Sequence, residues 1–180
     1  RYKPAGVTVI VVRPQTGAIL AMANRPDFDP NRPGGFHPAS RRNRAVTDTM
    51  EPGSTFKIVT VAGALQDGRV TLNSIFDCER GSFYHGGRRL RDHHPYGKLS
   101  VKKIITKSSN IGAAKVGIRL GAARLHHYVQ ELGFGERTRV SLLGEVRGTV
   151  HPLKNWNKLS ITRVPMGHEV AVTPMQMVMM

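Results

Sequence analysis

Apolar residues are distributed unevenly along this chain, and their spacing predicts strands first and helices later. Residues 7–12 form an apolar, β-branched run, which predicts a strand buried on both faces. Residues 13–17 supply turn residues, and residues 18–23 are suited to return as the second strand of a hairpin. Residues 24–44 carry four prolines and many polar side chains, so we expect a long irregular loop there.

An apolar helix is predicted after the turn at Pro52-Gly53, and Asp67-Gly68 ends it. Apolar residues lie around most of its circumference, so we expect the helix to be buried on nearly all sides. Its first turn nevertheless carries Lys57, and a buried ammonium group is costly unless it is paired or neutralised. Lys57 therefore either reaches solvent at the helix end or has a chemical role.

The second half of the chain has the periodicity of helices. Residues 69–99 predict short strands and loops, and Ser100 is a favoured N-cap for the helix that follows. Two further helices are predicted to end at Gly121 and Gly133, and Thr173 to cap a last one. Strands followed by helices indicate a mixed α/β (α+β) fold, and no change in composition marks an internal domain boundary.

Composition narrows the classes of partner. The chain has 27 basic and 12 acidic residues, a net charge of +15, which fits a solvated basic surface or attraction to a polyanion. Only 6% of residues are aromatic, and none lies among the basic clusters, so a stacking platform for nucleic acid is not expected. The single cysteine, Cys78, excludes an internal disulfide and a cysteine-based zinc cage. The adjacent pairs His93-His94 and His126-His127 diverge on a helix, so we expect no metal and no cofactor.

Ser54 and Lys57 form the first candidate for chemistry. Three residues apart on a helix, their side chains lie on one face about one turn apart. The free N–H groups of a helix N-terminus stabilise negative charge, and an amine with a lowered pKa can accept the serine proton. This pair would be a nucleophile and its base without a histidine. Taken alone, the spacing favours the simpler interpretation of a capping serine followed by a lysine that reaches solvent.

Ser108, Ser109 and Asn110 form a second polar cluster, on the short connection between two predicted helices. A hydroxyl there can relay a proton, and an amide can orient a lysine and bind a substrate amide. Serine and asparagine are also favoured N-caps, so helix capping alone explains this cluster as well.

Together, the two clusters have the order S-x-x-K and then S-x-N, which is typical of penicillin-binding proteins and β-lactamases. From about Val7 to its last residue, the chain resembles the class B penicillin-binding proteins, the monofunctional peptidoglycan D,D-transpeptidases. The stretches that carry this resemblance are TGAILAMANRPDFDPN, RNRAVTD, EPGSTFKIVT, SSNIGAAKVG, LGFGERT and VAVTPMQ.

The resemblance implies a penicillin-binding-protein/β-lactamase-like transpeptidase fold with an N-terminal β-hairpin and a helical subdomain. It implies that Ser54 attacks the penultimate D-Ala carbonyl of a stem peptide, with its own N–H as an oxyanion donor. Lys57 would be the base, Ser108 would pass a proton to the leaving amine, and Asn110 would hold Lys57 and the substrate amide. An amine of a neighbouring stem peptide would complete the cross-link, and β-lactams would acylate the same serine.

The third motif of the family, K-[ST]-G, does not occur in the 180 residues. In the family it lies on a strand that lines the cleft and supplies the second oxyanion donor. We therefore expect residues 1–180 to be a partial transpeptidase domain, inactive by itself, without the last sheet strands, the membrane anchor and the pedestal domain. A serine β-lactamase, a penicillin-sensing domain and a non-catalytic scaffold module are the alternative interpretations.

The resemblance also implies partners and a compartment. The expected partners are D-Ala-D-Ala stem peptides, β-lactams, a glycosyltransferase and other proteins of the cell-wall machinery, and no nucleic acid. The expected location is the outer, periplasmic face of the cytoplasmic membrane, reached only through an N-terminal anchor outside this sequence. Glu51 and Glu169 are further candidates for shaping the cleft, although Glu51 also favours the start of a helix.

Overall fold

The computed structural model describes residues 3–180, which form two compact units. The first unit contains the described residues up to Met50, together with Gly133–Gly148 and Val172–Met180. The second contains Glu51–Leu132 and Thr149–Ala171. Because each unit is assembled from segments that alternate along the chain, no single linker separates them. This is why the composition of the sequence shows no internal boundary.

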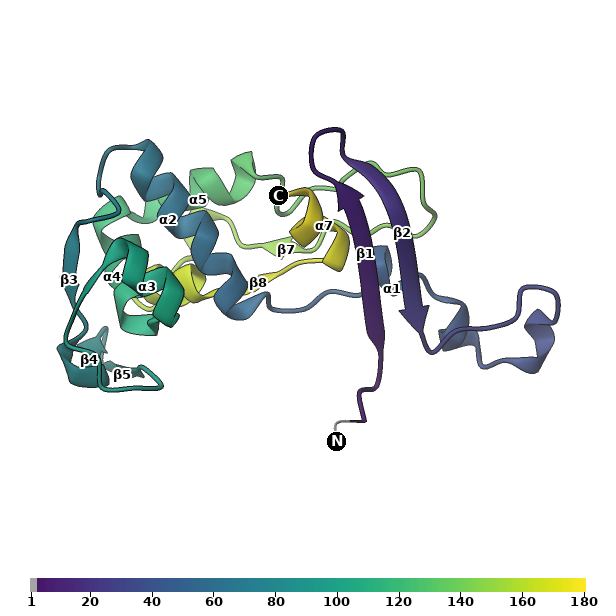
Figure 1. The fold of residues 1–180 in the computed structure, drawn as a ribbon, viewed down its shortest axis with the longest axis horizontal. Helices are drawn as coiled ribbons and strands as arrows, with labels where there is room; N and C mark the ends of the chain where they lie inside the picture. The colour runs from purple at the N-terminus through teal and green to yellow at the C-terminus, as the bar shows by residue number, and fades with distance from the viewer. Residues whose placement is uncertain (1–2) are drawn as a thin grey trace. The chain divides into compact units, whose positions relative to one another are not determined.

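The first unit is built on the predicted hairpin (Figure 1). Strand β1, Val7–Arg13, pairs antiparallel with β2, Ala18–Arg25, and the register shifts between Val11 and Val12. The predicted loop after the hairpin holds only short 3₁₀ turns before the one-turn helix α1. The remaining elements of this unit are η1 (Pro33–Gly35), η2 (Pro38–Arg41), α1 (Arg44–Thr47) and α7 (Pro174–Met179).

The prediction that residues 7–12 are buried on both faces is wrong. Val7, Val9 and Val11 alternate with half-buried residues, and Val9 is 53% exposed. The opposite face carries Ile10 and Met22, which pack against a buried cluster of Ala45, Val46 and Met175. No element among residues 3–180 buries the face that carries Val9, so one side of this apolar strand meets solvent.

Helix α7 connects the hairpin to the loop over residues 133–148. Thr173 caps the helix in a reciprocal box with Gln176, which confirms the predicted N-cap. The Gln176 side-chain amide also donates to the carbonyl oxygens of Glu136 and Arg147, at 2.7 and 2.9 Å. The buried Gln176 side chain thus forms hydrogen bonds with the N-cap of its own helix and with two carbonyl groups of a distant loop.

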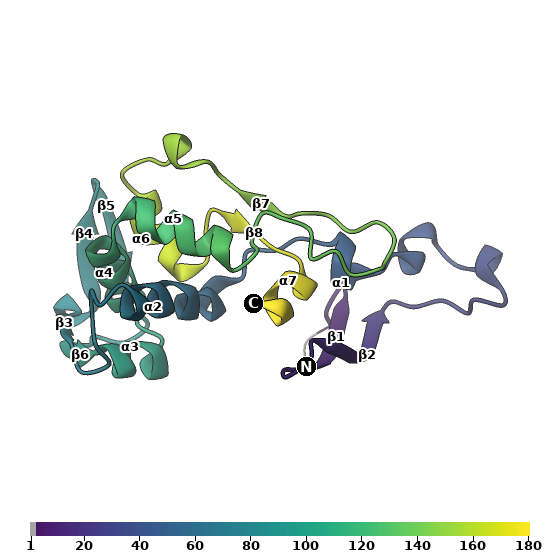
Figure 2. The ribbon, with the colours of Figure 1, turned by 90° about the horizontal axis from the view of Figure 1, so that it is seen from above.

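The second unit is mainly helical. A 3₁₀ turn, η3 (Gly53–Phe56), leads into α2 (Lys57–Gln66), which lies against α4 (Asn110–Leu120) in both Figure 1 and Figure 2. Gly63 of α2 also permits close packing against Tyr128, because a Cβ at Gly63 would lie 2.4 Å from the Tyr128 ring. The other helices are α3 (Val101–Lys107), α5 (Ala122–Glu131), α6 (Ser160–Arg163) and the 3₁₀ turn η6 (Val164–Met166).

Three two-stranded antiparallel sheets complete the described part of the second unit. They confirm the predicted short strands between residues 69 and 99, and Ser100 caps α3 as expected. No helix among residues 3–180 is long and apolar enough to span a membrane. The strand pairs are β3 (Ile75–Asp77) with β6 (Lys98–Ser100), β4 (Ser82–His85) with β5 (Arg88–Arg91), and β7 (Thr149–Val150) with β8 (Val170–Ala171). Two 3₁₀ turns, η4 (Glu79–Gly81) and η5 (Leu153–Asn155), also belong to this unit.

Candidate active site

Ser54 lies in the 3₁₀ turn directly before α2, and its side chain is accessible to solvent. The turn is held from behind by Gly167, whose carbonyl oxygen accepts the Gly53 N–H at 3.2 Å. Gly167 has φ of +77°, and a Cβ there would lie 2.2 Å from the Gly53 carbonyl oxygen. Only glycine therefore lets these two backbones touch, and their contact fixes where the serine is presented.

The amine of Lys57 is the centre of the site. Its side chain is only 2% exposed, although it follows Ser54 by a single turn. Lys57 Nζ lies 3.0 Å from Ser54 Oγ, 2.9 Å from Ser108 Oγ, 2.8 Å from Asn110 Oδ1 and 2.6 Å from the Ser108 carbonyl oxygen. The structure thus brings together all four residues expected from the sequence: Ser54, Lys57, Ser108 and Asn110. The interpretation of Lys57 as a side chain that reaches solvent is wrong.

The oxygen neighbours of Lys57 suit a neutral amine. The Ser108 carbonyl oxygen and Asn110 Oδ1 can only accept, so they use the two N–H bonds of a neutral Nζ. The nitrogen lone pair is then free to accept a hydroxyl proton from Ser54 or Ser108. An ammonium group has three N–H bonds and no lone pair, so it cannot accept the proton of Ser54.

The surroundings of Lys57 also shift its equilibrium toward the neutral form. Burial lowers the pKa of Lys57 from 10.5 to about 8, while the Asp92 carboxylate acts in the opposite direction. With this pKa, about one tenth of the amine is neutral at pH 7, against less than about one part in a thousand for an ordinary lysine. The site therefore holds a usable base near neutral pH.

The second cluster is positioned by the junction of two helices. Ser108 is the C-cap of α3 in the left-handed region, with φ of +54°, which turns its carbonyl oxygen and its hydroxyl toward Lys57. Ser109 is buried and caps α4, where its Oγ accepts the Gly112 N–H at 2.9 Å. Asn110 is the first residue of α4. The alternative interpretation as capping residues thus holds for Ser109, while Ser108 and Asn110 contact the lysine.

Sequence reasoning missed Arg91 and Asp92, which lie where strand β5 ends. The Asp92 carboxylate accepts from Ser109 Oγ at 2.7 Å and from the N–H groups of Asn110 and Ile111 at 2.5 and 3.0 Å. The Arg91 carbonyl oxygen accepts from Asn110 Nδ2 at 3.1 Å. No local pattern marks these residues, because their partners follow only after another strand and helix α3.

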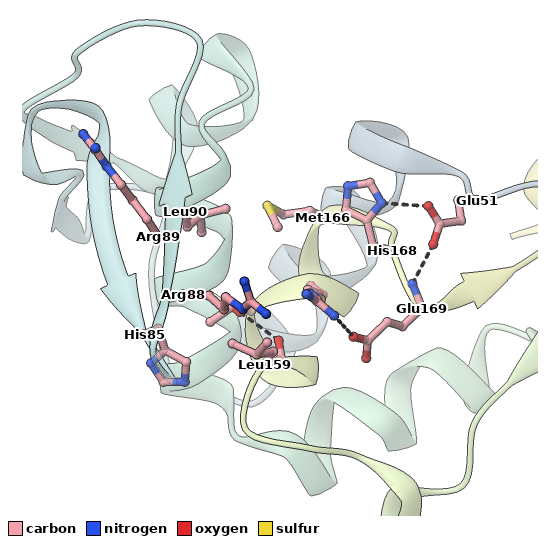
Figure 3. Close-up of a pocket in the computed structure, with 11 residues that line it drawn as sticks. Glu51, His85, Arg88, Arg89, Leu90, Leu159, Met166, His168 and Glu169 are labelled. Carbon is pink, nitrogen blue, oxygen red and sulfur yellow. Dashed lines mark hydrogen bonds and ion pairs between the residues drawn. The ribbon is translucent and has the colours of Figure 1, made fainter.

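The Glu51 carboxylate forms hydrogen bonds with His168 and Glu169, in the segment that precedes β8. The carboxylate lies 2.9 Å from His168 Nδ1 and accepts the Glu169 N–H at 3.0 Å (Figure 3). These two hydrogen bonds, the one from His168 first, lower the pKa of Glu51. A hollow of about 620 Å³ lies between these residues and the β4–β5 hairpin. In the chain, the lining residues Met166 and His168 flank Gly167, and Leu90 precedes Arg91.

Comparison with known proteins identifies the family of this chain. The profile of the penicillin binding protein transpeptidase domain matches residues 7–180. The chain belongs to the family of penicillin-binding protein transpeptidase domains. It is 38% identical over 170 residues to a probable peptidoglycan D,D-transpeptidase PenA of Neisseria gonorrhoeae, and 36% identical over 181 residues to the stage V sporulation protein D of Bacillus subtilis. These alignments cover 94% and 99% of the chain.

Solved transpeptidase structures share the fold. The crystal structure of penicillin binding protein 3 from Mycobacterium tuberculosis, complexed with aztreonam, superposes with a TM-score of 0.89 at 31% identity, covering 96% of this chain and 39% of that one. The transpeptidase domain of penicillin-binding protein 3 from Burkholderia pseudomallei gives 0.84 at 31% identity, covering 96% and 47%. The predicted fold class is confirmed. The transpeptidase-family chain described here spans 29% of the length of the gonococcal relative and 28% of the Bacillus protein.

Proposed function

We propose that the full-length protein is a peptidoglycan D,D-transpeptidase that works through an acyl-enzyme on Ser54. The observation that carries this proposal is the buried Lys57 amine, 3.0 Å from Ser54 Oγ and with a pKa lowered to about 8. Relatives named as peptidoglycan D,D-transpeptidases support the choice of reaction. The β-lactamase, sensor and scaffold alternatives have no comparable support.

Acylation begins at the neutral form of Lys57. Its lone pair takes the Ser54 proton while Oγ bonds to the carbonyl carbon of the penultimate D-Ala. The negative charge moves to the carbonyl oxygen, toward the N–H groups at the start of the helix. When this intermediate collapses, the C–N bond to the terminal D-Ala breaks. The amine leaves with a proton that Lys57 returns through the Ser108 hydroxyl, 2.9 Å away.

Deacylation repeats these steps with a different nucleophile. The amine of a neighbouring stem peptide attacks the ester carbonyl, a new amide bond forms, and Ser54 regains its proton. A β-lactam follows the first half of this route, since Ser54 opens its cyclic amide and the amine stays tethered. Because that amine does not depart, it continues to occupy the position that the acceptor amine needs.

The proposal extends to where the protein works and with whom. Its substrates are peptidoglycan stem peptides that end in D-Ala-D-Ala, and its partners are a glycosyltransferase and other proteins of the cell-wall machinery. Such substrates lie on the periplasmic side of the cytoplasmic membrane. We infer that residues 1–180 form one part of the transpeptidase domain, and that the K-[ST]-G strand is supplied by sequence beyond them.

The test is covalent labelling of the full-length protein with a fluorescent penicillin. Ser54→Ala is expected to abolish labelling, because it removes the hydroxyl that attacks the β-lactam carbonyl. Ser141→Ala, an exposed serine of the other unit, is the matched control and should label at the wild-type rate. An acyl-enzyme that persists for hours supports a transpeptidase, while release within seconds indicates a β-lactamase. Undiminished labelling of Ser54→Ala would show that Ser54 is not the nucleophile.

A further inference from the structure

The start of helix α4 depends on a residue outside the family motifs. The first four N–H groups of a helix have no partner within it. In α4, the N–H groups of Asn110 and Ile111 donate to Asp92 Oδ1, and the Gly112 N–H donates to Ser109 Oγ. Ser109 Oγ in turn donates to Asp92 Oδ2 at 2.7 Å. Asp92 therefore holds two of these N–H groups directly and the third through Ser109.

Two adjacent residues, Arg91 and Asp92, hold both the backbone and the side chain of Asn110. Asp92 accepts its backbone N–H, while the carbonyl oxygen of Arg91 accepts its side-chain Nδ2. The second contact decides which way the amide faces, since Oδ1 must then point away from Arg91. That oxygen lies 2.8 Å from Lys57 Nζ.

We propose that Arg91 and Asp92 form a clamp that positions Asn110 against Lys57, and that Asp92 is a positioning residue for acyl transfer. This inference rests on the proposed function. Asp92 accepts three hydrogen bonds and donates none, which is the bonding pattern of a carboxylate. Its negative charge also raises the pKa of Lys57, against the larger effect of burial. The clamp thus acts on both the position and the basicity of the lysine.

Two substitutions separate these effects. Asp92→Asn keeps an oxygen for the two N–H groups, and its NH₂ group can donate to Ser109 Oγ, so the geometry is retained while the charge is lost. Lys57 should then titrate at lower pH, by about half a pH unit or more. Asp92→Ala removes the clamp as well, and we expect acylation by penicillin to slow at least about tenfold.

The experiment uses the full-length protein with ¹³C-labelled lysine, with the Lys57 resonance assigned by its loss in Lys57→Arg. NMR titration gives the Lys57 midpoint, and stopped-flow labelling gives the acylation rate for each folded variant. The matched control is Asp67→Asn, because the Asp67 carboxylate binds Arg124 and Tyr128 on α5. A purely structural role predicts equal effects of Asp92→Asn and Asp67→Asn.

An unchanged Lys57 midpoint in Asp92→Asn would overturn the electrostatic part of the inference. Wild-type acylation by folded Asp92→Ala would overturn the positioning part. If Asp92→Ala does not fold, the acylation rate of Asp92→Asn tests the positioning part instead. At pH 9 the Lys57 amine is mostly neutral in both proteins, so a retained clamp predicts a rate within about threefold of wild type. A larger loss of rate would overturn the positioning part. Absence of labelling in the wild-type protein would count against the proposed function, while the NMR titration still tests the clamp.

A separate observation concerns Arg88, which lines the hollow beside Glu51. Its side chain extends into the space between the β4–β5 hairpin and the segment that carries Leu159 (Figure 3). The other charged groups there have partners, since Arg163 pairs with Glu169 at 2.9 Å and Glu51 with His168. Among residues 3–180, no side chain forms an ion pair or hydrogen bond with the Arg88 guanidinium.

We infer that Arg88 binds a carboxylate of the peptide substrate, at a point before its D-Ala-D-Ala end. An unpaired guanidinium in a concave site favours a bidentate carboxylate. This inference also rests on the proposed function, and it adds a preference among substrates.

The test compares two synthetic peptides that end in D-Ala-D-Ala, one with a free side-chain carboxylate and one with that group amidated. The wild-type protein should have a KM about tenfold lower for the acidic peptide, at similar kcat. Arg88→Gln should remove the difference, while Arg13→Gln, an exposed arginine of the hairpin, should keep it. Equal KM values in the wild type would overturn the role of Arg88, whereas turnover of neither peptide would count against the proposed function.

Discussion

The β1–β2 hairpin and the α2–α4 helix pair contain similar side chains but bury them very differently. Val59 in α2 and Val116 in α4 have no exposed surface, whereas Val9 in β1 is 53% exposed. Glycines in both helices allow other elements to approach them closely, and one face of the hairpin is left uncovered among the described residues. An apolar run thus indicates which residues can be buried, while the neighbouring elements determine which are.

The helix pair uses its tight packing for chemistry. Lys57 is buried, as Val59 is, and exclusion of water is what lowers the pKa of Lys57. An exposed lysine on the open face of the hairpin would be protonated at neutral pH. The difference between the two regions therefore predicts where substitutions have large effects and where they have small ones.

The largest effect is expected for Lys57→Arg. Arginine keeps the positive charge but does not deprotonate in proteins, so it cannot accept the Ser54 proton. Acylation of the full-length protein by penicillin should fall at least about a thousandfold, as in Lys57→Ala. Rates from stopped-flow fluorescence would measure this. A Lys57→Arg protein close to wild-type activity would show that only the charge at this position matters.

The next effect concerns the pH dependence of stability. In the unfolded chain Lys57 titrates near 10.5 and in the folded chain near 8, so between these values the unfolded state binds more protons. The free energy of unfolding should therefore rise with pH across this window, by about 3 kcal/mol from Lys57 alone. Urea unfolding of the wild type and of Lys57→Met at pH 7.5, 9 and 10.5 isolates this contribution. A constant difference between the two proteins would mean that the lysine is not destabilised by burial.

Gly112→Ala tests the close packing of the helices. A Cβ at Gly112 would lie 2.5 Å from Ile104 Cγ1, and Ile104 is fully buried and cannot move aside. We expect a loss of about 1–3 kcal/mol in the free energy of unfolding. Gly97→Ala is the control, because no atom lies within 4 Å of a Cβ there. Similar losses in both variants would show that backbone flexibility, and not packing, is responsible.

The smallest effect is expected on the open face of the hairpin. Val9→Thr should change the free energy of unfolding by no more than about 0.5 kcal/mol, because Val9 is half exposed already. Ile10→Thr, on the face packed against Ala45 and Val46, should cost about 1 kcal/mol or more. Thermal unfolding of both variants gives the comparison. A larger loss from Val9→Thr than from Ile10→Thr would mean that the uncovered face is buried in solution.

Much of this arrangement could be predicted because it is local. Helix α3 follows from Ser100 and the spacing of its apolar residues, and the start of α7 follows from Thr173. The spacing of Ser54 and Lys57 made them candidates for a nucleophile and its base, and the family resemblance assigned these roles. The later cluster was assigned through family resemblance, since nothing in the residues 107–110 alone separates a catalytic serine from a capping one.

The sequence by itself determined the elements, the order of the motifs and the spacing of Ser54 and Lys57, because hydrogen bonds within a turn depend on nearby residues. Only the tertiary structure decided that Lys57 is buried among the oxygens of Ser54, Ser108 and Asn110. It also decided that Asp92 holds the start of α4, and that one face of β1 stays exposed. Burial and pKa depend on what packs from elsewhere in the chain, and a residue's own neighbours in sequence do not specify that.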